Sequence, residues 1–175
     1  MTVPIEPISE SQKAEVVAAT EDCIKKAGQL YDRQFSSLPV LFDLKGSCAG
    51  MYQRLDASRR IRYNPWLFAK HYAYSLRQTV PHEVAHFIAD CLWGIRCIKP
   101  HGKEWRSVMT ALGAEPVATA KYSLEGIPVR QYQRFSYQCE CQVHQLTAIR
   151  HRRVLLRKAV YRCQHCGGPL RAVAQ

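Results

Sequence analysis

The sequence has no long hydrophobic run, although 47% of its 175 residues are apolar. Apolar runs such as residues 91–93 are far shorter than the roughly 20 residues that a membrane-spanning helix needs. The first six residues, MTVPIE, show neither the basic start nor the apolar stretch of a secretory signal. We therefore expect a cytoplasmic protein without a membrane partner. Internal repeats and low-complexity tracts are also absent, which excludes solenoid and fibrous classes.

Acidic residues are scarce in the last third of the chain. From Lys121 onward, ten Lys or Arg residues stand against only Glu125 and Glu140, so this part has a net charge of +8, out of +11 for the whole chain. Such a one-sided charge favours a polyanionic partner, and nucleic acid is the commonest polyanion of the cytoplasm. The alternative is a basic surface that only keeps the protein soluble.

The motif His82-Glu83-Val84-Ala85-His86 has the pattern H-E-x-x-H within a helix-compatible run. Residues four apart lie on one face of a helix, so His82 and His86 are able to hold one metal ion together. Glu83, about 100° around the helix, can stand beside that ion as a general base. Asp90, one turn beyond His86, could orient an imidazole by a hydrogen bond without binding the metal itself. The alternative is two partly buried histidines on an ordinary amphipathic helix.

A third ligand is needed, because a catalytic zinc usually has three protein ligands and one open position. The longer motif HExxHxxGxxH would need Gly and His where this chain has Ala89 and Leu92. His71 is eleven residues before the motif, about 16 Å away along a helix. We therefore favour His101, which follows a short connector, with Glu104 in reserve. The alternative for His101 is a surface loop histidine.

Eight cysteines in a reducing compartment indicate metal ligands and free thiols rather than disulfides. Cys139-x-Cys141 and Cys163-x-x-Cys166-Gly-Gly have the spacing of a zinc ribbon, in which soft ligands close a structural tetrahedral site. The short first pair leaves two ligand sets open. One consists of the four thiolates, which we favour, and the other has His144 in place of Cys139. The remaining cysteines have no metal spacing.

The segment between the two cysteine pairs is basic, and we expect it to form a β-hairpin arm that contacts phosphates. The residues expected to bind nucleic acid are Arg150, Arg152, Arg153, Arg157 and Lys158; His151 and Arg162 lie in the same segment. Aromatic residues nearby could stack on unpaired bases, or could simply pack a small ribbon. These aromatics are Tyr132, Phe135, Tyr137 and Tyr161.

Apolar periodicity and turn residues predict an α+β fold, with helices packed on a small three-stranded sheet and a small β zinc ribbon after it. Pro81 predicts either a kink at Val80 or a new helix start near Thr79. Asn64-Pro65 is typical of a helix start. The expected helices are 9–33, 66–93 and 103–112, and the expected strands are 38–44, 49–55 and 59–63, the last two forming a hairpin.

Together, His82-Glu83-x-x-His86, His101-Gly-Lys-Glu-Trp, Cys139-x-Cys141 and Tyr-Arg-Cys163-x-x-Cys166-Gly closely resemble the SprT family, from about residue 9 to 170. The resemblance implies a minimal zincin-like metalloprotease domain over 9–120, a linker over 121–135 and a zinc ribbon with its basic arm over 136–171. It also implies that the three histidines bind a catalytic zinc and that Glu83 is catalytic. The eukaryotic relative Spartan cleaves proteins crosslinked to DNA and is activated by DNA.

These features predict a DNA-associated zinc metalloprotease with one catalytic and one structural Zn²⁺, a protein substrate and a preference for single-stranded DNA. Tyr122 or Tyr63 is a candidate donor to the oxyanion, and an edge strand is expected to hold the substrate as an added strand. One alternative is a zinc-dependent nucleic-acid-binding protein with a vestigial protease site. A second is a metallohydrolase that acts on a small molecule, which leaves the basic ribbon unexplained.

Overall fold

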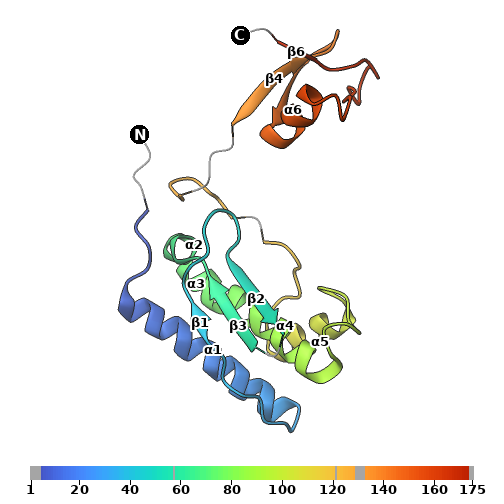
Figure 1. The fold of residues 1–175 in the computed structure, drawn as a ribbon. Helices are drawn as coiled ribbons and strands as arrows, with labels where there is room; N and C mark the ends of the chain where they lie inside the picture. The colour runs from blue at the N-terminus through green and yellow to red at the C-terminus, as the bar shows by residue number, and fades with distance from the viewer. Residues whose placement is uncertain (1–4, 57, 121, 129–132, 174–175) are drawn as a thin grey trace. The chain divides into compact units, whose positions relative to one another are not determined.

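The computed structural model describes residues 5–56, 58–120, 122–128 and 133–173, and it contains two compact units, Met1–Val129 and Arg130–Gln175 (Figure 1). Helices and small sheets alternate along the chain, which confirms the α+β class. No helix within the described ranges is long and apolar enough to cross a membrane.

The sheet of the first unit has three strands, β1 (Val40–Leu41), β2 (Gly50–Leu55) and β3 (Ser58–Tyr63), in the order β1-β3-β2 (Figure 1). β2 and β3 form the antiparallel hairpin that the sequence predicted, whereas β1 pairs with β3 in parallel. β2 therefore has one paired edge, on β3, and is an edge strand of this sheet.

Helix α1 (Glu10–Leu30) begins at a capping box. The Ser9 hydroxyl accepts from the backbone N–H of Gln12, and the Gln12 side chain accepts in return from the N–H of Ser9, so two N–H groups without helical partners are satisfied. The buried stripe of α1 packs against α4. This stripe consists of Val16, Thr20, Ile24 and Ala27.

The helical run after the sheet has four parts: α2 (Pro65–Lys70), α3 (Tyr72–Tyr74), a π-helical turn η1 (Ser75–Thr79) and α4 (Val80–Trp93). Asn64 caps α2 by accepting from the N–H groups of Trp66 and Leu67. The sequence predicted a kink at Val80 or a new helix start near Thr79, and α4 does begin at Val80, directly after Thr79. The wider turn η1 leads into it, and Pro81 lies in the first turn of α4, where its missing N–H is tolerated.

Helix α4 lies at the centre of the first unit, where it contacts α1, α5 (Lys103–Ala111), β2 and β3. One apolar cluster joins these elements. Its largest fully buried members are Trp105, Tyr63, Phe68, Ile61, Ile88 and Met109. Because α4 is buried on several sides, side chains on its first two turns have fixed positions.

The described part of the second unit contains a sheet of β4 (Arg134–Gln138), β5 (Val143–Thr147) and β6 (Arg171–Ala172), in the order β5-β4-β6, and the helix α6 (Ala148–Leu155). Buried side chains are few among its described residues: Tyr137, Leu146 and Cys163. β4 begins at Arg134, within the range predicted to be a linker.

The expectation of a β-hairpin arm between the cysteine pairs was wrong. Residues Ala148–Leu155 form α6, whose first turn is capped by the Thr147 hydroxyl, which accepts from the N–H of Arg150. Five of these eight residues are Arg, Leu or Ala, which favour helices, and the Thr147 cap stabilises a helix start directly after β5.

Candidate metal centres

Three histidine rings meet beside α4. His82 and His86 lie one turn apart on α4, and His101 lies two residues before α5. The Nε2 atom of His101 is 3.0 Å from Nε2 of His82 and 3.1 Å from Nε2 of His86. One Nε2 has a single proton or lone pair, so hydrogen bonding alone does not satisfy both contacts. Three nitrogens bound tetrahedrally to zinc at ~2.05 Å lie about 3.3 Å apart, so this cluster fits one shared ion.

The surroundings of the rings keep them neutral, the form that binds metal. Burial, with a smaller contribution from His101, lowers the pKa of His82 to about 4. Burial and then the two neighbouring rings lower the pKa of His86 to about 3. His101 has a positive φ of 55°, an uncommon conformation that turns its ring back toward α4, and burial lowers its pKa too.

Trp105 packs against the histidine cluster. Its ring centroid lies 4.7 Å from those of His82 and His101, and its indole N–H donates to the carbonyl oxygen of His82 over 3.2 Å. Glu104, the reserve ligand, does not belong to the cluster of three histidines. Its Oε1 atom lies 4.0 Å from the ammonium nitrogen of Lys103, with which it forms an ion pair. The structure thus gathers the ligand set with His101.

Glu83 lies next to the histidines and is held by the edge strand. Its Oε2 atom accepts a 2.7 Å hydrogen bond from the backbone N–H of Tyr52 in β2. Its Oε1 atom lies so close to Gly50 that a Cβ at that position would be 2.6 Å away. Only 5% of Glu83 is exposed, and burial raises its pKa to about 8. The sequence offered no local signal for these contacts, since 31 residues separate Tyr52 from Glu83.

Asp90 does not orient an imidazole, contrary to the expectation from its spacing. Its carboxylate accepts instead from the Tyr52 hydroxyl at 2.6 Å, from Arg54 at 2.8 Å and from Arg59 at 3.0 Å. The backbone N–H of Ile95 donates to it as well. Asp90 therefore joins the end of α4 to the β2–β3 hairpin, and in this way fixes β2 beside Glu83.

Two hollows adjoin the histidines, and Gly50, His82 and Glu83 line both of them. The first continues over Cys48, Thr79, Tyr122 and the segment 117–120. The second is mostly apolar, and its further lining residues include Met51, Tyr52, Ile95, Ile98 and Trp105. Of the two tyrosines considered as oxyanion donors, Tyr122 thus lies beside the site. Tyr63 does not, because it is fully buried in the core with its hydroxyl on Thr20.

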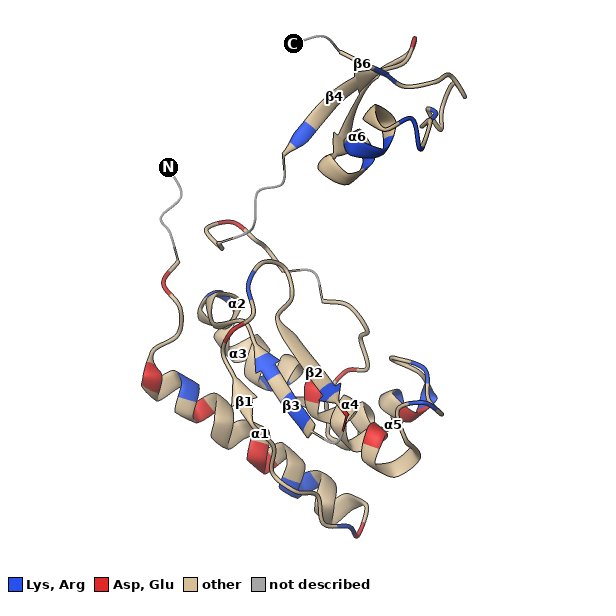
Figure 2. Ribbon diagram, in the orientation of Figure 1, with Lys and Arg blue, Asp and Glu red and all other residues tan. Residues whose placement is uncertain are grey.

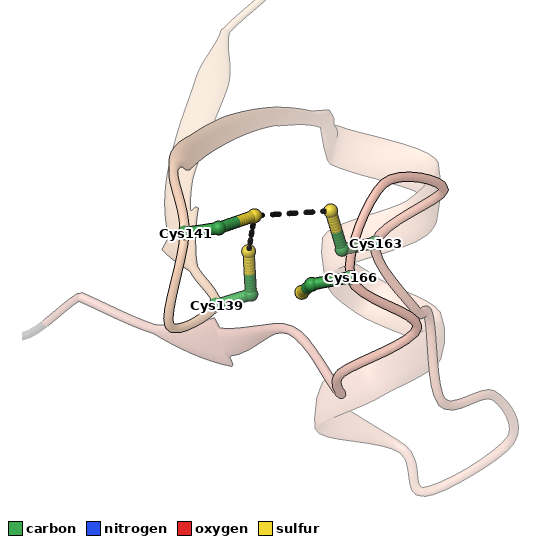
Figure 3. A group of neighbouring side chains, drawn as sticks. All are labelled: Cys139, Cys141, Cys163 and Cys166. Carbon is green, nitrogen blue, oxygen red and sulfur yellow. Dashed lines mark hydrogen bonds between the residues drawn. The ribbon is translucent and has the colours of Figure 1, made fainter.

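The second unit gathers the four cysteines predicted as a zinc ribbon (Figure 3). Their sulfur atoms all lie within 4.8 Å of one another. The sulfur of Cys141 lies 3.4 Å from that of Cys139 and 3.7 Å from that of Cys163. His144, from the other ligand set, is an outer neighbour with its Nε2 atom 3.4 Å from the sulfur of Cys139. Four converging sulfurs fit one tetrahedral metal ion.

The loop that carries Cys163 and Cys166 favours the thiolate form of Cys163. The backbone N–H of His165 points at the sulfur of Cys163 over 3.3 Å, and Gly167, with φ of 71°, closes the turn. The N–H of Cys166, and then that of His165, lower the pKa of Cys163 to about 5. The thiolate is the form that binds metal, so these amides favour the ligand state.

The basic residues expected to bind nucleic acid lie on α6 and just after it, where the ribbon in Figure 2 carries the blue of Lys and Arg. All five are exposed: Arg150, Arg152, Arg153, Arg157 and Lys158. The aromatics are only partly available. Tyr137 is buried and hydrogen-bonded to His151, whose ring stacks on Phe135 at 3.7 Å. Arg150 lies over the ring of Tyr161, and Tyr132 lies outside the described residues.

Comparison with known proteins gives one family. The model of the SprT-like family matches residues 20–133. "Protein SprT" of Vibrio parahaemolyticus is 37% identical over 85% of this chain and 87% of its own length, and that of Actinobacillus succinogenes is 36% identical over 92% and 91%. The Salmonella newport protein is 35% identical over 97% and 98%. No solved structure matches the chain.

Proposed function

Because the chain belongs to the SprT-like family, as its motifs predicted, we propose that it is a zinc-dependent metalloprotease whose first unit is a minimal zincin-like catalytic domain. The observation that carries this proposal is the meeting of three histidine nitrogens beside one buried carboxylate. A purely structural metal site has no need of a carboxylate there, whereas hydrolysis needs a group that accepts a proton from water.

The residues divide the work of peptide hydrolysis among them. A zinc ion held by His82, His86 and His101 would supply Lewis acidity to the attacking water and the scissile carbonyl group. Glu83 accepts the proton of that water and delivers it to the leaving amine. The N–H of Tyr52 holds the Glu83 carboxylate in place beside the histidines, because its 2.7 Å hydrogen bond fixes Oε2.

The substrate would lie along β2. This strand is at the edge of its sheet, and an edge strand can accept an extended peptide as an additional strand. The two hollows share the β2 residue Gly50 and also Glu83, so a peptide that passes along β2 would meet both. The apolar walls of the second hollow fit an apolar side chain of the substrate.

The test compares wild type with Glu83→Gln, which keeps the shape of the side chain and removes its basicity. We expect about two zinc ions per chain in both proteins, and cleavage of a DNA-binding protein by wild type alone, measured with and without single-stranded DNA. Equal cleavage by both would exclude Glu83 as the base. Full zinc content without cleavage in the wild type would favour the alternative, a nucleic-acid-binding protein with a vestigial protease site.

We propose further that single-stranded DNA binds the second unit through α6, where exposed Arg residues gather. Each Lys or Arg that neutralises a phosphate releases counterions, so affinity falls with salt. Arg152→Glu together with Arg153→Glu should weaken binding about tenfold or more and reduce the salt slope by roughly 1.4. The matched control reverses two exposed lysines of the first unit, Lys25 and Lys103, and should bind almost as wild type does.

A further inference from the structure

The segment that follows α5 returns to the catalytic site, and its later residues are held by contacts with α2 and with Ala49. Residues 117–120 form one wall of the first hollow. Beyond them, Ile127 is buried in a small apolar cluster with Ala49 and Leu67. Lys70 donates to the Ser123 hydroxyl at 3.0 Å and to the carbonyl oxygen of Glu125 at 2.6 Å. In the sequence, Tyr122 thus stands between the residues that line the hollow and the residues that these contacts hold in place.

The side chain of Tyr122 is itself positioned by the helical run that leads to the catalytic motif. Its hydroxyl is 2.7 Å from the hydroxyl of Thr79, which precedes Glu83 by one turn. Its ring packs against His71, with centroids 5.2 Å apart, and edge-on against Tyr74 at 5.9 Å. These contacts hold Tyr122 in the wall of the hollow that His82 and Glu83 also line.

We propose that Tyr122 is a catalytic residue whose hydroxyl donates a hydrogen bond to the scissile carbonyl oxygen as negative charge develops on that oxygen. In this assignment Thr79 is the donor in the 2.7 Å contact between the two hydroxyls, so the phenolic proton of Tyr122 is left for the substrate, since a tyrosine hydroxyl can accept and donate at once. This inference rests on the proposed protease function and assigns the electrophilic donor of that reaction.

Tyr122 stabilises charge and transfers no proton. When water adds to the peptide, a bond forms between the water oxygen and the carbonyl carbon, and the π electrons of the carbonyl group move onto its oxygen. The hydrogen bond from Tyr122 strengthens at this point. When the electron pair returns, the C–N bond breaks, and the amine takes the proton that Glu83 removed from the water. Burial raises the pKa of Tyr122, so its hydroxyl remains a donor at neutral pH.

The test is Tyr122→Phe in the full chain, with zinc content and thermal unfolding measured beside kinetics on a peptide substrate. Loss of one oxyanion donor should lower kcat about 10²–10³-fold, leave KM within about threefold and leave zinc binding unchanged. A phosphinic peptide, which mimics the tetrahedral carbon, should lose affinity by a comparable factor. Thr79→Val keeps the Tyr122 hydroxyl but removes its anchor, so its kcat should fall by about tenfold.

The matched control is Tyr72→Phe, which removes a hydroxyl that bonds to Glu15 at 2.7 Å, away from the hollow. Its kcat should stay near that of wild type. An active wild type with a Tyr122→Phe kcat within twofold would overturn the role of Tyr122 and leave the protease function standing. A zinc-loaded wild type without peptidase activity would overturn the protease function and this inference with it.

Discussion

At the scale of single residues, the position of Glu83 depends on a glycine. A Cβ at Gly50 would lie 2.6–2.9 Å from three atoms of the Glu83 side chain, closer than such atoms can approach. Gly50→Ala should therefore push the carboxylate away from its place and lower kcat/KM by about 10²-fold, since a shift of about 1 Å in a catalytic group has an effect of this size. Zinc content should remain unchanged, because the three histidines keep their positions.

Gly46→Ala is the control for this prediction. Gly46 has φ of 75° and no other atom within 4 Å of the added Cβ, so alanine there costs backbone strain of about 1 kcal/mol without touching the site. Its unfolding temperature should fall while kcat/KM stays close to wild type. A similar loss of kcat/KM in both variants would show that the hairpin as a whole, rather than contact with Glu83, is disturbed.

At the scale of secondary structure, Asp90 ties the end of α4 to the β2–β3 hairpin. Its side chain is fully buried and accepts from Arg54 and Arg59, whose own side chains are about one third exposed. Asp90→Asn leaves both guanidinium groups without their anion and should lower the free energy of unfolding by about 2–3 kcal/mol. Asp43→Asn removes an exposed pair with Arg62 and should change little, as urea unfolding of both variants can measure.

The carboxylate of Asp90 also makes the free energy of unfolding depend on pH in the acidic range. Burial by itself would raise the pKa of Asp90, but hydrogen bonds from Tyr52 and Arg59 outweigh it and hold the pKa below its ordinary value. A group with a lowered folded-state pKa stabilises the fold above its unfolded-state pKa of about 3.9, and this stabilisation is lost as the pH falls through the folded-state pKa. The unfolding free energy of wild type should fall more steeply below about pH 4 than that of Asp90→Asn. Parallel curves would exclude Asp90 as the source.

What the sequence predicted at this scale depended on local patterns. The first helix, the β2–β3 hairpin and the helix start at Asn64-Pro65 arise from neighbouring residues, and the structure has each of them. The i, i+4 spacing of the motif likewise placed two histidines and a carboxylate together. Contacts between distant segments, such as that of Gly50 with Glu83, could not be predicted, because no local pattern encodes them. The hairpin predicted from the ribbon motif does not form, because the composition of Ala148–Leu155 and the Thr147 cap favour the helix α6.

At the scale of the whole molecule, the two units differ in how they can be stable. The first has an extended apolar core around α4, whereas the described part of the second buries only Tyr137, Leu146 and Cys163. A unit as small as Arg130–Gln175 cannot bury enough apolar surface to fold unaided, so its folding should depend on the metal bound by its cysteines. The core of the first unit makes no such demand on its metal.

Cys163→Ser in the full chain separates the two units. Loss of one thiolate should reduce bound zinc from about two ions to one and open the second unit to limited proteolysis, while the main thermal transition of the first unit stays within a few degrees of wild type. Cys97→Ser, an exposed thiol outside both centres, should change neither result.

Since DNA is proposed to bind α6, Cys163→Ser should also lose binding of single-stranded DNA and any stimulation by it, yet keep basal cleavage of a peptide. Loss of basal cleavage together with the ribbon would instead mean that the catalytic unit needs the second unit for its own structure, and the division into a self-sufficient protease and a metal-dependent DNA-binding ribbon would be wrong.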